Sequence, residues 1–158
     1  MQTFKEFALR LYGQPEVEAE CLHWQDSHGV SVPLLLCCAW LDWRKVGCEP
    51  AQLQTLVAPV LAWEQDIVWP MRKLRREFKV AATKDAAAEQ ARERIKQAEL
   101  QAELVVLDKL AALPWLPSPH SALASLIQHY QLAECDGFPA LRQAVAALQP
   151  VRLTGPDN

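Results

Sequence analysis

Apolar residues recur at spacings of three and four along most of the chain, and glycines and prolines separate the segments in which they recur. This period is that of an amphipathic α-helix. The signals for helix ends agree, because Thr3 and Glu6 form a capping box, Gly29 and Gly47 are C-terminal stops, and Pro15 suits a first turn. The pattern predicts a first helix over about residues 4–12 and further helices that begin near residues 15, 31, 50, 84, 118 and 139.

Two of the predicted helices have unusual compositions. Residues 34–41 are apolar on nearly all sides, and a helix without a polar face belongs in the middle of a core. The helix that begins at Pro50 contains Pro59 and Pro70. Each interior proline removes a backbone hydrogen bond and crowds the preceding turn, so we expect kinks or breaks at both positions.

Residues 71–113 contain neither glycine nor proline. We expect this stretch to divide into two helices, one that ends near residue 80 and one that spans about residues 84–112. Thr83, which Asp85 follows closely in the sequence, is the expected N-cap of the second helix. The alternative is one continuous rod of about 64 Å. A compact domain of this length would leave such a rod largely unsupported, which favours the break.

The fold class follows from these segments. No segment of length alternates apolar and polar residues as a strand does, and the chain has no internal repeat. The sequence predicts an all-α fold, a single-domain bundle of about seven helices with proline-kinked central helices. Because 158 residues suffice for one core, residues 1–150 are predicted to form a single domain and residues 151–158 a frayed tail.

The composition indicates little about binding partners, but it bears on the cellular compartment. A net charge of −3 and a hydrophobic content of 51% are ordinary for a soluble protein, so any preference for a partner must be local. The longest apolar run, Val32 to Leu41, is too short for a membrane span, which needs about 20 residues, and the N-terminus lacks a secretory h-region. Five cysteines without a C-x-x-C pair are typical of reduced thiols. We therefore expect a cytoplasmic protein.

Several sequence blocks resemble a known family. They are F-x-x-F-A-L-x-L-Y from Phe4, V-P-L-L-L-C-C-A-W-L from Val32, and W-x-x-x-x-V-W-P-M-R-K-L-R-R-x-x-K from Trp63. Over about residues 4–110 the chain resembles a family of small uncharacterised proteins from gammaproteobacteria. It departs from the family pattern at Pro33 and Cys37, and neither departure changes the predicted helix. The resemblance implies a bacterial, cytoplasmic protein and no particular activity.

A basic block is the sharpest local signal. It consists of Arg72, Lys73, Arg75, Arg76 and Lys79, and four of its members stand at i, i+3, i+4 and i+7. Residues 71–96 hold nine Lys or Arg against four Asp or Glu, a net charge of +5, whereas residues 1–70 carry −5. Arginine forks suit phosphate and carboxylate oxygens, so an anionic partner would fit this face. The alternatives are that it pairs internally with acids of residues 1–70, or is only solvated.

Tryptophan is the second compositional signal, with six residues in the chain. Indoles can line an apolar pocket, and the candidate lining residues are Trp40, Asp42, Trp43, Trp63 and Trp69. The simpler interpretation is that the indoles fill the core. Asp42 is then the carboxylate of an ion pair with Arg44 or with an arginine of the basic block.

Signals for catalysis and metal binding are weak. Asp26 and His28 lie on different sides of a predicted helix, as do Cys21 and His23, so neither pair is placed to act together. No phosphate loop, nucleophile elbow or cofactor fingerprint occurs. We predict no catalytic residue, no metal site and no cofactor.

These observations favour a non-enzymatic helical adaptor or regulatory protein that binds a protein or a phosphate-bearing partner through the basic block. One alternative is a nucleic-acid-binding protein that uses the same cations. Another is a small-molecule binder or enzyme with a Trp-lined pocket. No membrane partner is expected, and the sequence does not define the oligomeric state.

Overall fold

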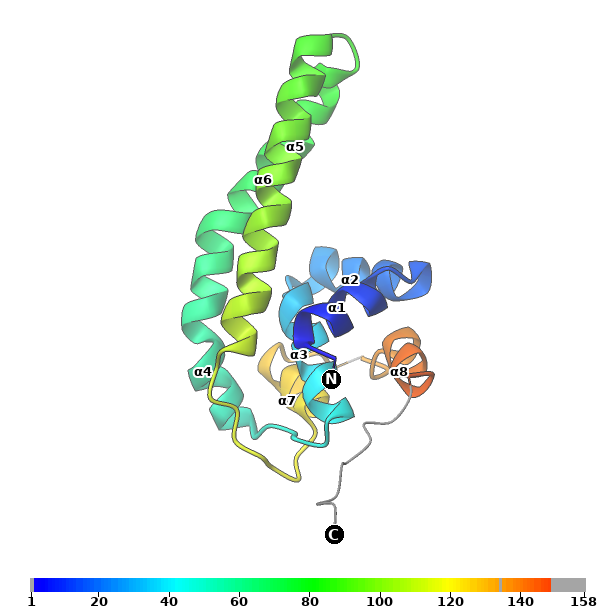
Figure 1. Ribbon diagram of the computed structural model, residues 1–158, viewed down its shortest axis with the longest axis vertical. Coiled ribbons are helices and arrows are strands. Elements are labelled where there is room, and N and C mark those ends of the chain that lie inside the picture. Colours follow the sequence, from blue (N-terminus) through cyan, green and yellow to red (C-terminus); the bar gives the residue numbers. More distant parts are fainter. Residues whose placement is uncertain (1, 134, 149–158) are drawn as a thin grey trace. The chain divides into compact units, whose positions relative to one another are not determined.

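The computed structural model describes residues 2–133 and 135–148, and in these residues every regular element is a helix, which confirms the predicted all-α class. The elements are α1 (Phe4–Tyr12), α2 (Pro15–His28), α3 (Val32–Trp43), α4 (Pro50–Trp63), the π-helix η1 (Glu64–Val68), α5 (Trp69–Ala82), α6 (Ala86–Ala111), α7 (Ala122–His129) and α8 (Pro139–Ala146) (Figure 1). The tail predicted at residues 151–158 lies outside the described residues.

The helix ends in the first third of the chain follow the sequence signals. The Thr3 hydroxyl accepts from the Glu6 backbone N–H, and the Glu6 carboxylate accepts from the Thr3 N–H, so the capping box is complete. Gly29 ends α2 in the left-handed conformation, with φ of 66°. Ser31 caps α3 by accepting from Leu34 N–H at 3.3 Å. Local signals therefore set these boundaries correctly.

The two interior prolines behave differently from each other. Pro59 does not interrupt α4, which continues to Trp63, so the structure shows no break there. Ahead of Pro70 the helix widens into η1, and the Trp69 N–H bonds to the carbonyl of Glu64, five residues back. A wider turn relieves the crowding that a proline ring imposes on the preceding carbonyls. The helical path thus passes Pro70 through a π-turn.

The predicted break in residues 71–113 is confirmed, although its cap is not the expected residue. The Thr83 hydroxyl donates to the Val80 carbonyl at 2.8 Å and so belongs to the end of α5. Asp85 is the N-cap of α6, because its carboxylate accepts from the N–H groups of Ala87 and Ala88 at 2.9 and 3.4 Å.

The chain divides into two compact units. One holds the described residues of 1–54 and 114–158, and the other holds residues 55–113. The prediction of a single domain over residues 1–150 stays a prediction.

The first unit is organised around α3. All residues from 34 to 41 are buried, as the apolar pattern predicted. Helices α1, α2, α7 and α8 pack around α3 (Figure 1). Phe7 and Phe138, which are both fully buried, contribute large side chains to this core.

Helix α7 begins later than predicted, at Ala122 behind a Ser121 N-cap, and ends at His129. The reason is that the preceding residues bond to another loop. The N–H of Ser118 donates to the carbonyl of Val46 at 2.7 Å, and the N–H of Cys48 donates to the carbonyl of His120 at 2.9 Å. These long-range bonds hold residues 118–120 outside the helix.

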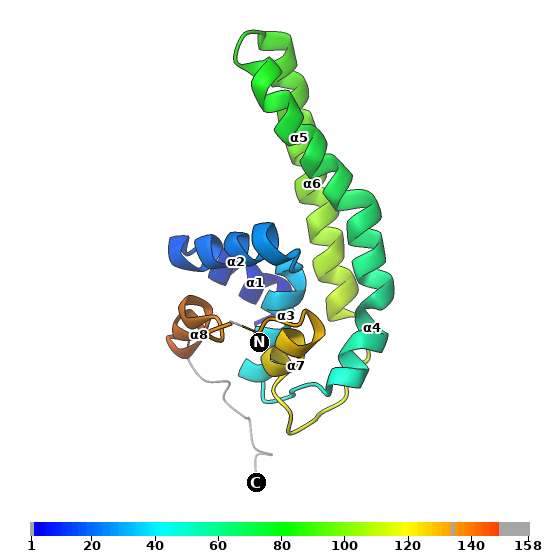
Figure 2. The ribbon, with the colours of Figure 1, turned by 180° about the vertical axis from the view of Figure 1, so that it is seen from behind.

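In the second unit, α5 and α6 form an antiparallel hairpin whose tip lies at residues 83–85 (Figures 1 and 2). The helix α6 is 26 residues long, so it runs beside both η1 and α5. The hairpin carries the basic block on α5.

Candidate partner-binding face of α5

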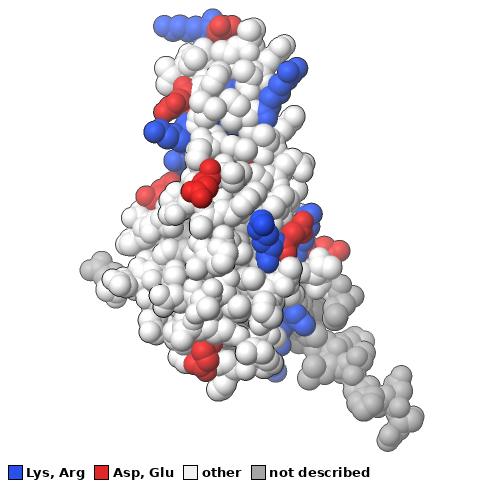
Figure 3. All heavy atoms as spheres, turned by 90° about the vertical axis from the view of Figure 1, so that its left-hand side faces the viewer, with Lys and Arg blue, Asp and Glu red and all other residues white. Residues whose placement is uncertain are grey.

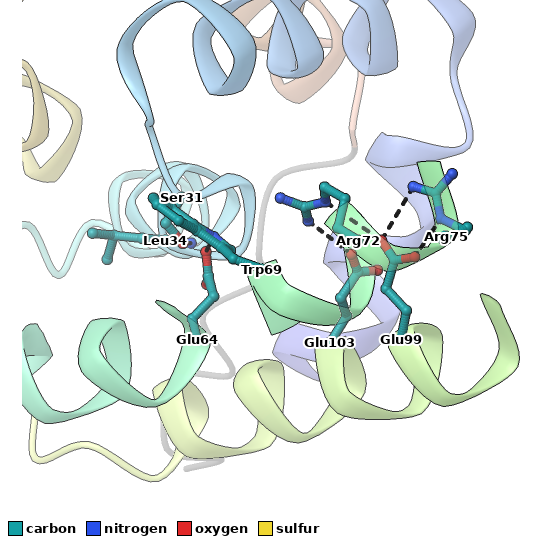
Figure 4. Close-up of polar contacts among 8 residues, drawn as sticks. All are labelled: Ser31, Leu34, Glu64, Trp69, Arg72, Arg75, Glu99 and Glu103. Carbon is teal, nitrogen blue, oxygen red and sulfur yellow. Dashed lines mark hydrogen bonds and ion pairs between the residues drawn. The ribbon is translucent and has the colours of Figure 1, made fainter. Parts of the chain in front are cut away.

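Two arginines of the basic block are bound to carboxylates of α6 (Figure 4). Arg72 Nε lies 3.4 Å from Glu99 Oε1, and Arg72 Nη2 lies 3.0 Å from Glu103 Oε1. Arg75 meets Glu99 at two points, with Nε donating to Oε2 and Nη2 donating to Oε1 at 3.3 Å. Internal pairing, one of the alternatives for this block, therefore holds for Arg72 and Arg75. The acids of these contacts, Glu99 and Glu103, lie on α6, whereas the alternative considered from the sequence was pairing with acids of residues 1–70.

Of the paired carboxylates, Glu99 is buried, whereas the side chain of Glu103 is 35% exposed. Glu99 is 5% exposed. Burying an ionised carboxylate costs free energy, and the two guanidinium groups that bind Glu99 offset this cost. Burial raises the pKa of Glu103, and the hydrogen bond from Arg72 acts in the opposite direction. The hydrogen bond to Glu99 raises the pKa of Arg75. The pairs thus connect α5 to α6 through charge in addition to apolar packing.

The ion pairs also define which side of α5 faces outward. Because Arg72 and Arg75 are directed at α6, the exposed cations are Lys73, Arg76 and Lys79. At 100° per residue these three and Val80, which is 78% exposed, span about 120° of the helix, an arc that also includes Arg72. We call Lys73, Arg76, Lys79 and Val80 the outward face of α5.

Helix α5 buries none of its residues, although it contains Met, Leu, Phe and Val. Around the tip of the hairpin, lysine and arginine side chains are interspersed with acidic ones (Figure 3). On α6, Arg92 lies 3.5 Å from Glu89 and 3.7 Å from Glu93, and its buried Nε has no hydrogen-bond partner. Part of the positive charge of residues 71–96 is therefore compensated locally.

The tryptophans of the candidate pocket do not come from one unit. Trp40, Asp42 and Trp43 lie on α3, and Trp63 and Trp69 flank η1 in the other unit. The Trp63 ring has the ammonium group of Lys109 5.4 Å from its centre, and Trp69 Nε1 donates to Glu64 Oε1 at 3.3 Å. The structure gives each of these two indoles its own polar neighbour.

The indoles of α3 pack against α1. The ring centres of Trp40 and Phe4 are 5.2 Å apart, and those of Trp43 and Phe7 are 5.3 Å apart. Arg44 lies over the Trp40 ring, with Cζ 4.6 Å from its centre. Trp40 Nε1 is buried without a hydrogen-bond partner.

Asp42 caps a helix, which the sequence did not reveal. Its carboxylate accepts from the backbone N–H groups of Ala122 and Leu123 at 2.7 and 3.1 Å and from the Ser121 hydroxyl at 2.7 Å. The expected ion pair with Arg44 is not what the structure shows, because Arg44 stacks on Trp40. The negative charge of Asp42 therefore lies at the positive end of α7, where the helix dipole stabilises it.

A groove in the first unit was also missed by the sequence reasoning. It has a volume of about 590 Å³ and lies between α2 and the segment that follows α7, with Glu20, His23, Trp24 and His28 on one side and Asp136 on the other. A helical wheel of α2 alone could not show it, because the opposite wall comes from residues more than a hundred positions away.

The described residues offer no constellation for metal binding, since no three His, Cys, Asp or Glu side chains among them are placed to hold one ion. The five cysteines are free thiols. In the described part of the chain no helix is both long and apolar enough to cross a bilayer.

Fold and site together define an all-helical protein with a charge-paired helical hairpin that bears exposed cations on α5. Residues 3–110 match the family described as "Protein of unknown function (DUF2390)", and the chain belongs to this family. The expected membership in a family without an assigned activity is thereby confirmed. The comparisons with curated proteins and with solved structures gave no match.

Proposed function

We propose that this protein is a non-enzymatic adaptor or regulatory protein that binds an anionic partner, in the first place a protein, through the outward face of α5. The observation that carries the proposal is that α5 buries none of its residues while it exposes Lys73, Arg76 and Lys79 around an exposed valine. A helix with an apolar residue among cations has the composition that a carboxylate-rich surface would recognise.

The ion pairs of Arg72 and Arg75 narrow the candidate site. These two side chains are 16% and 24% exposed and are bound to Glu99, so a partner meets Lys73, Arg76 and Lys79 first. Arg72 and Arg75 act as positioning residues, because their contacts with α6 keep the other three cations on the outer side of the hairpin. Five free cysteines agree with a reducing compartment, and the proposal places the protein in the bacterial cytoplasm.

The test is affinity capture from a native extract with the wild-type protein and a Lys73→Glu/Lys79→Glu variant. Reversing two exposed charges should abolish capture of the partner. The matched control is Lys5→Glu/Arg10→Glu, which makes the same change in net charge on α1 and should capture the partner as the wild type does.

Nuclease treatment separates the partner classes. Capture that survives nuclease and is lost only in the Lys73/Lys79 variant supports a protein partner. Capture that disappears with nuclease, and weakens steeply with salt, would instead favour the nucleic-acid alternative. Equal capture by all three proteins would show that the outward face of α5 is not the binding site.

A further inference from the structure

The surface of α2 has the opposite charge to α5. Helix α2 contains four acidic side chains, Glu16, Glu18, Glu20 and Asp26, and no Lys or Arg. Glu16 and Glu20 are one helical turn apart on the same side of α2, and Glu16 is exposed. The Glu20 carboxylate is held in place, because it accepts hydrogen bonds from the N–H groups of Ala140 and Leu141 at the start of α8 at 3.1 and 2.8 Å.

The groove beside α2 is suited to a cationic side chain. Glu20 on α2 and Asp136 on the segment before α8 each contribute a carboxylate to its lining, which also includes the buried Trp24. The imidazoles of His23 and His28 complete a lining that holds no Lys or Arg. A volume of about 590 Å³ is ample for the ammonium or guanidinium end of one long side chain.

Backbone conformation at this groove is unusual. Gln131, which lines it, has φ of 53°, and Phe138, which contacts the Trp24 ring with centres 5.7 Å apart, has φ of 61°. Both residues are non-glycine residues in the left-handed region, a strained conformation that persists where the surrounding structure enforces it. The wall of the groove is therefore held in a defined shape.

We propose that the outward face of α5 of one molecule docks on the acidic face of α2 of a second copy of this chain, with a lysine or arginine side chain entering the groove between Glu20 and Asp136. This inference rests on the proposed function, because it uses the same cations and names their partner. The two surfaces have complementary charges, since α5 exposes Lys73, Arg76 and Lys79 and α2 carries four acidic side chains, and every molecule presents both surfaces.

We take the docked molecule to be a second copy because the chain itself carries a basic surface that matches α2. In any solution of the protein, the basic and the acidic surfaces are therefore present at equal concentration. Exposed charges attract over about 10 Å at 0.1 M salt, so the association should weaken as salt is added.

The test uses two charge-reversal variants and sedimentation velocity at low and high salt. Lys73→Glu/Lys79→Glu makes the outward face of α5 acidic, and Glu16→Lys/Asp136→Lys makes the α2 surface basic. Each variant alone then presents two surfaces of like charge and should associate at least about tenfold more weakly than the wild type. An equimolar mixture of the two variants restores opposite charges at the contact and should associate again. Circular dichroism checks that both variants remain helical.

Salt-sensitive self-association of the wild type, its loss in each variant and its return in the mixture would support the contact. A wild type that stays monomeric at every concentration and at low salt overturns it, and so does a mixture that behaves as its two components do. The proposed function is tested separately, by capture of a protein other than a second copy of this chain. It fails if the Lys73→Glu/Lys79→Glu variant still captures that protein. A monomeric wild type that still captures such a protein would refute only the self-association.

Discussion

Arg75 of α5 and Glu99 of α6 form a two-point ion pair across the hairpin, and its Nη2 to Oε1 distance is 3.3 Å. The two residues are 24 positions apart and lie on either side of the turn at residues 83–85. Their contact divides the basic block of α5 into an inward pair, Arg72 and Arg75, and an outward set of cations. The basic surface that a partner could contact therefore contains fewer cations than the sequence alone implied.

Replacing Glu99 should weaken the hairpin. Glu99→Gln removes the charge that two partly buried guanidinium groups share, and we expect a loss of about 1–3 kcal/mol in the free energy of unfolding, less than for a fully buried pair. Urea denaturation measures the loss, and amide hydrogen exchange should show α5 opening more often. The control is Glu93→Gln on the same helix, whose side chain is 50% exposed and which should change stability by less than about 0.5 kcal/mol. Equal stability of both variants would contradict the structural role of Glu99.

Glu103 should give the protein a specific pH dependence. Burial raises its pKa above the ordinary value of 4.5, so the folded state binds this proton more tightly than the unfolded state does. The stabilisation from protonated Glu103 is present below pH 4.5 and is lost as the pH rises through the raised folded pKa. Glu103→Gln cannot ionise, so its stability relative to the wild type should increase as the pH rises from about 4 to about 7. Urea midpoints of both proteins across this range measure the difference, and a constant or decreasing difference would refute the prediction.

Removing the carboxylate of Asp42 should destabilise α7. Asp42→Ala leaves the N–H groups of Ala122 and Leu123 without their acceptor, and charge-assisted hydrogen bonds of this kind contribute about 1.5–3 kcal/mol. Thermal or urea unfolding gives the change. Asp108→Ala, at an exposed position of α6, is the control and should lie within about 0.5 kcal/mol of the wild type. A result in which the two variants are equally stable would rule out the capping role.

Gly47 should not tolerate a side chain. Its φ is +66°, and an added Cβ would overlap the backbone oxygens of Ser118 and His120. Gly47→Ala should therefore cost well over the roughly 1–2 kcal/mol of the left-handed conformation alone. Gly137→Ala, at φ of +82°, meets only the flexible side chain of Arg142 at 3.4 Å and should cost about that backbone penalty. Denaturation midpoints compare the two, and a Gly47 variant no less stable than the Gly137 variant would argue against the close approach of the two loops.

The cysteines should differ in reactivity. Burial raises the pKa of Cys21 to about 12 and that of Cys48 to about 11, and it raises the pKa values of Cys37 and Cys38 as well. Few of these thiols are thiolates near neutral pH, and none is accessible to a reagent. Alkylation of the folded protein, followed by peptide mass mapping, should modify the partly exposed Cys135 and leave the other four until denaturant is added. Rapid modification of Cys37 or Cys38 in the native state would contradict the packing of α3.

Most helix boundaries could be predicted because their causes are local. The capping box at Thr3, the glycine at Gly29 and the serine at Ser31 each act within one turn of the helix that they bound. The exceptions have distant causes. Helix α7 starts late because residues 118–120 bond to the loop that contains Gly47, and no pattern within α7 carries that information.

The candidate site was predictable only in part for the same reason. The sequence identified the basic block and left open whether it was paired. It could not show that Glu99 and Glu103 accept Arg72 and Arg75, because that contact depends on the register between two helices joined by the turn at residues 83–85. Asp42 was expected to pair with an arginine, and its actual partners lie 79 to 81 positions away.

The sequence by itself determined the all-α class, the central position of residues 34–41, the break near residue 83 and the concentration of positive charge in residues 71–96. Periodicity, capping and composition are sufficient for these features, since each depends on neighbours along the chain. The tertiary structure decided which cations face outward, where Asp42 directs its charge, and that a groove lies beside α2. Those features arise where segments distant in sequence meet, and the free energy of such contacts depends on side-chain geometry that residue order does not specify.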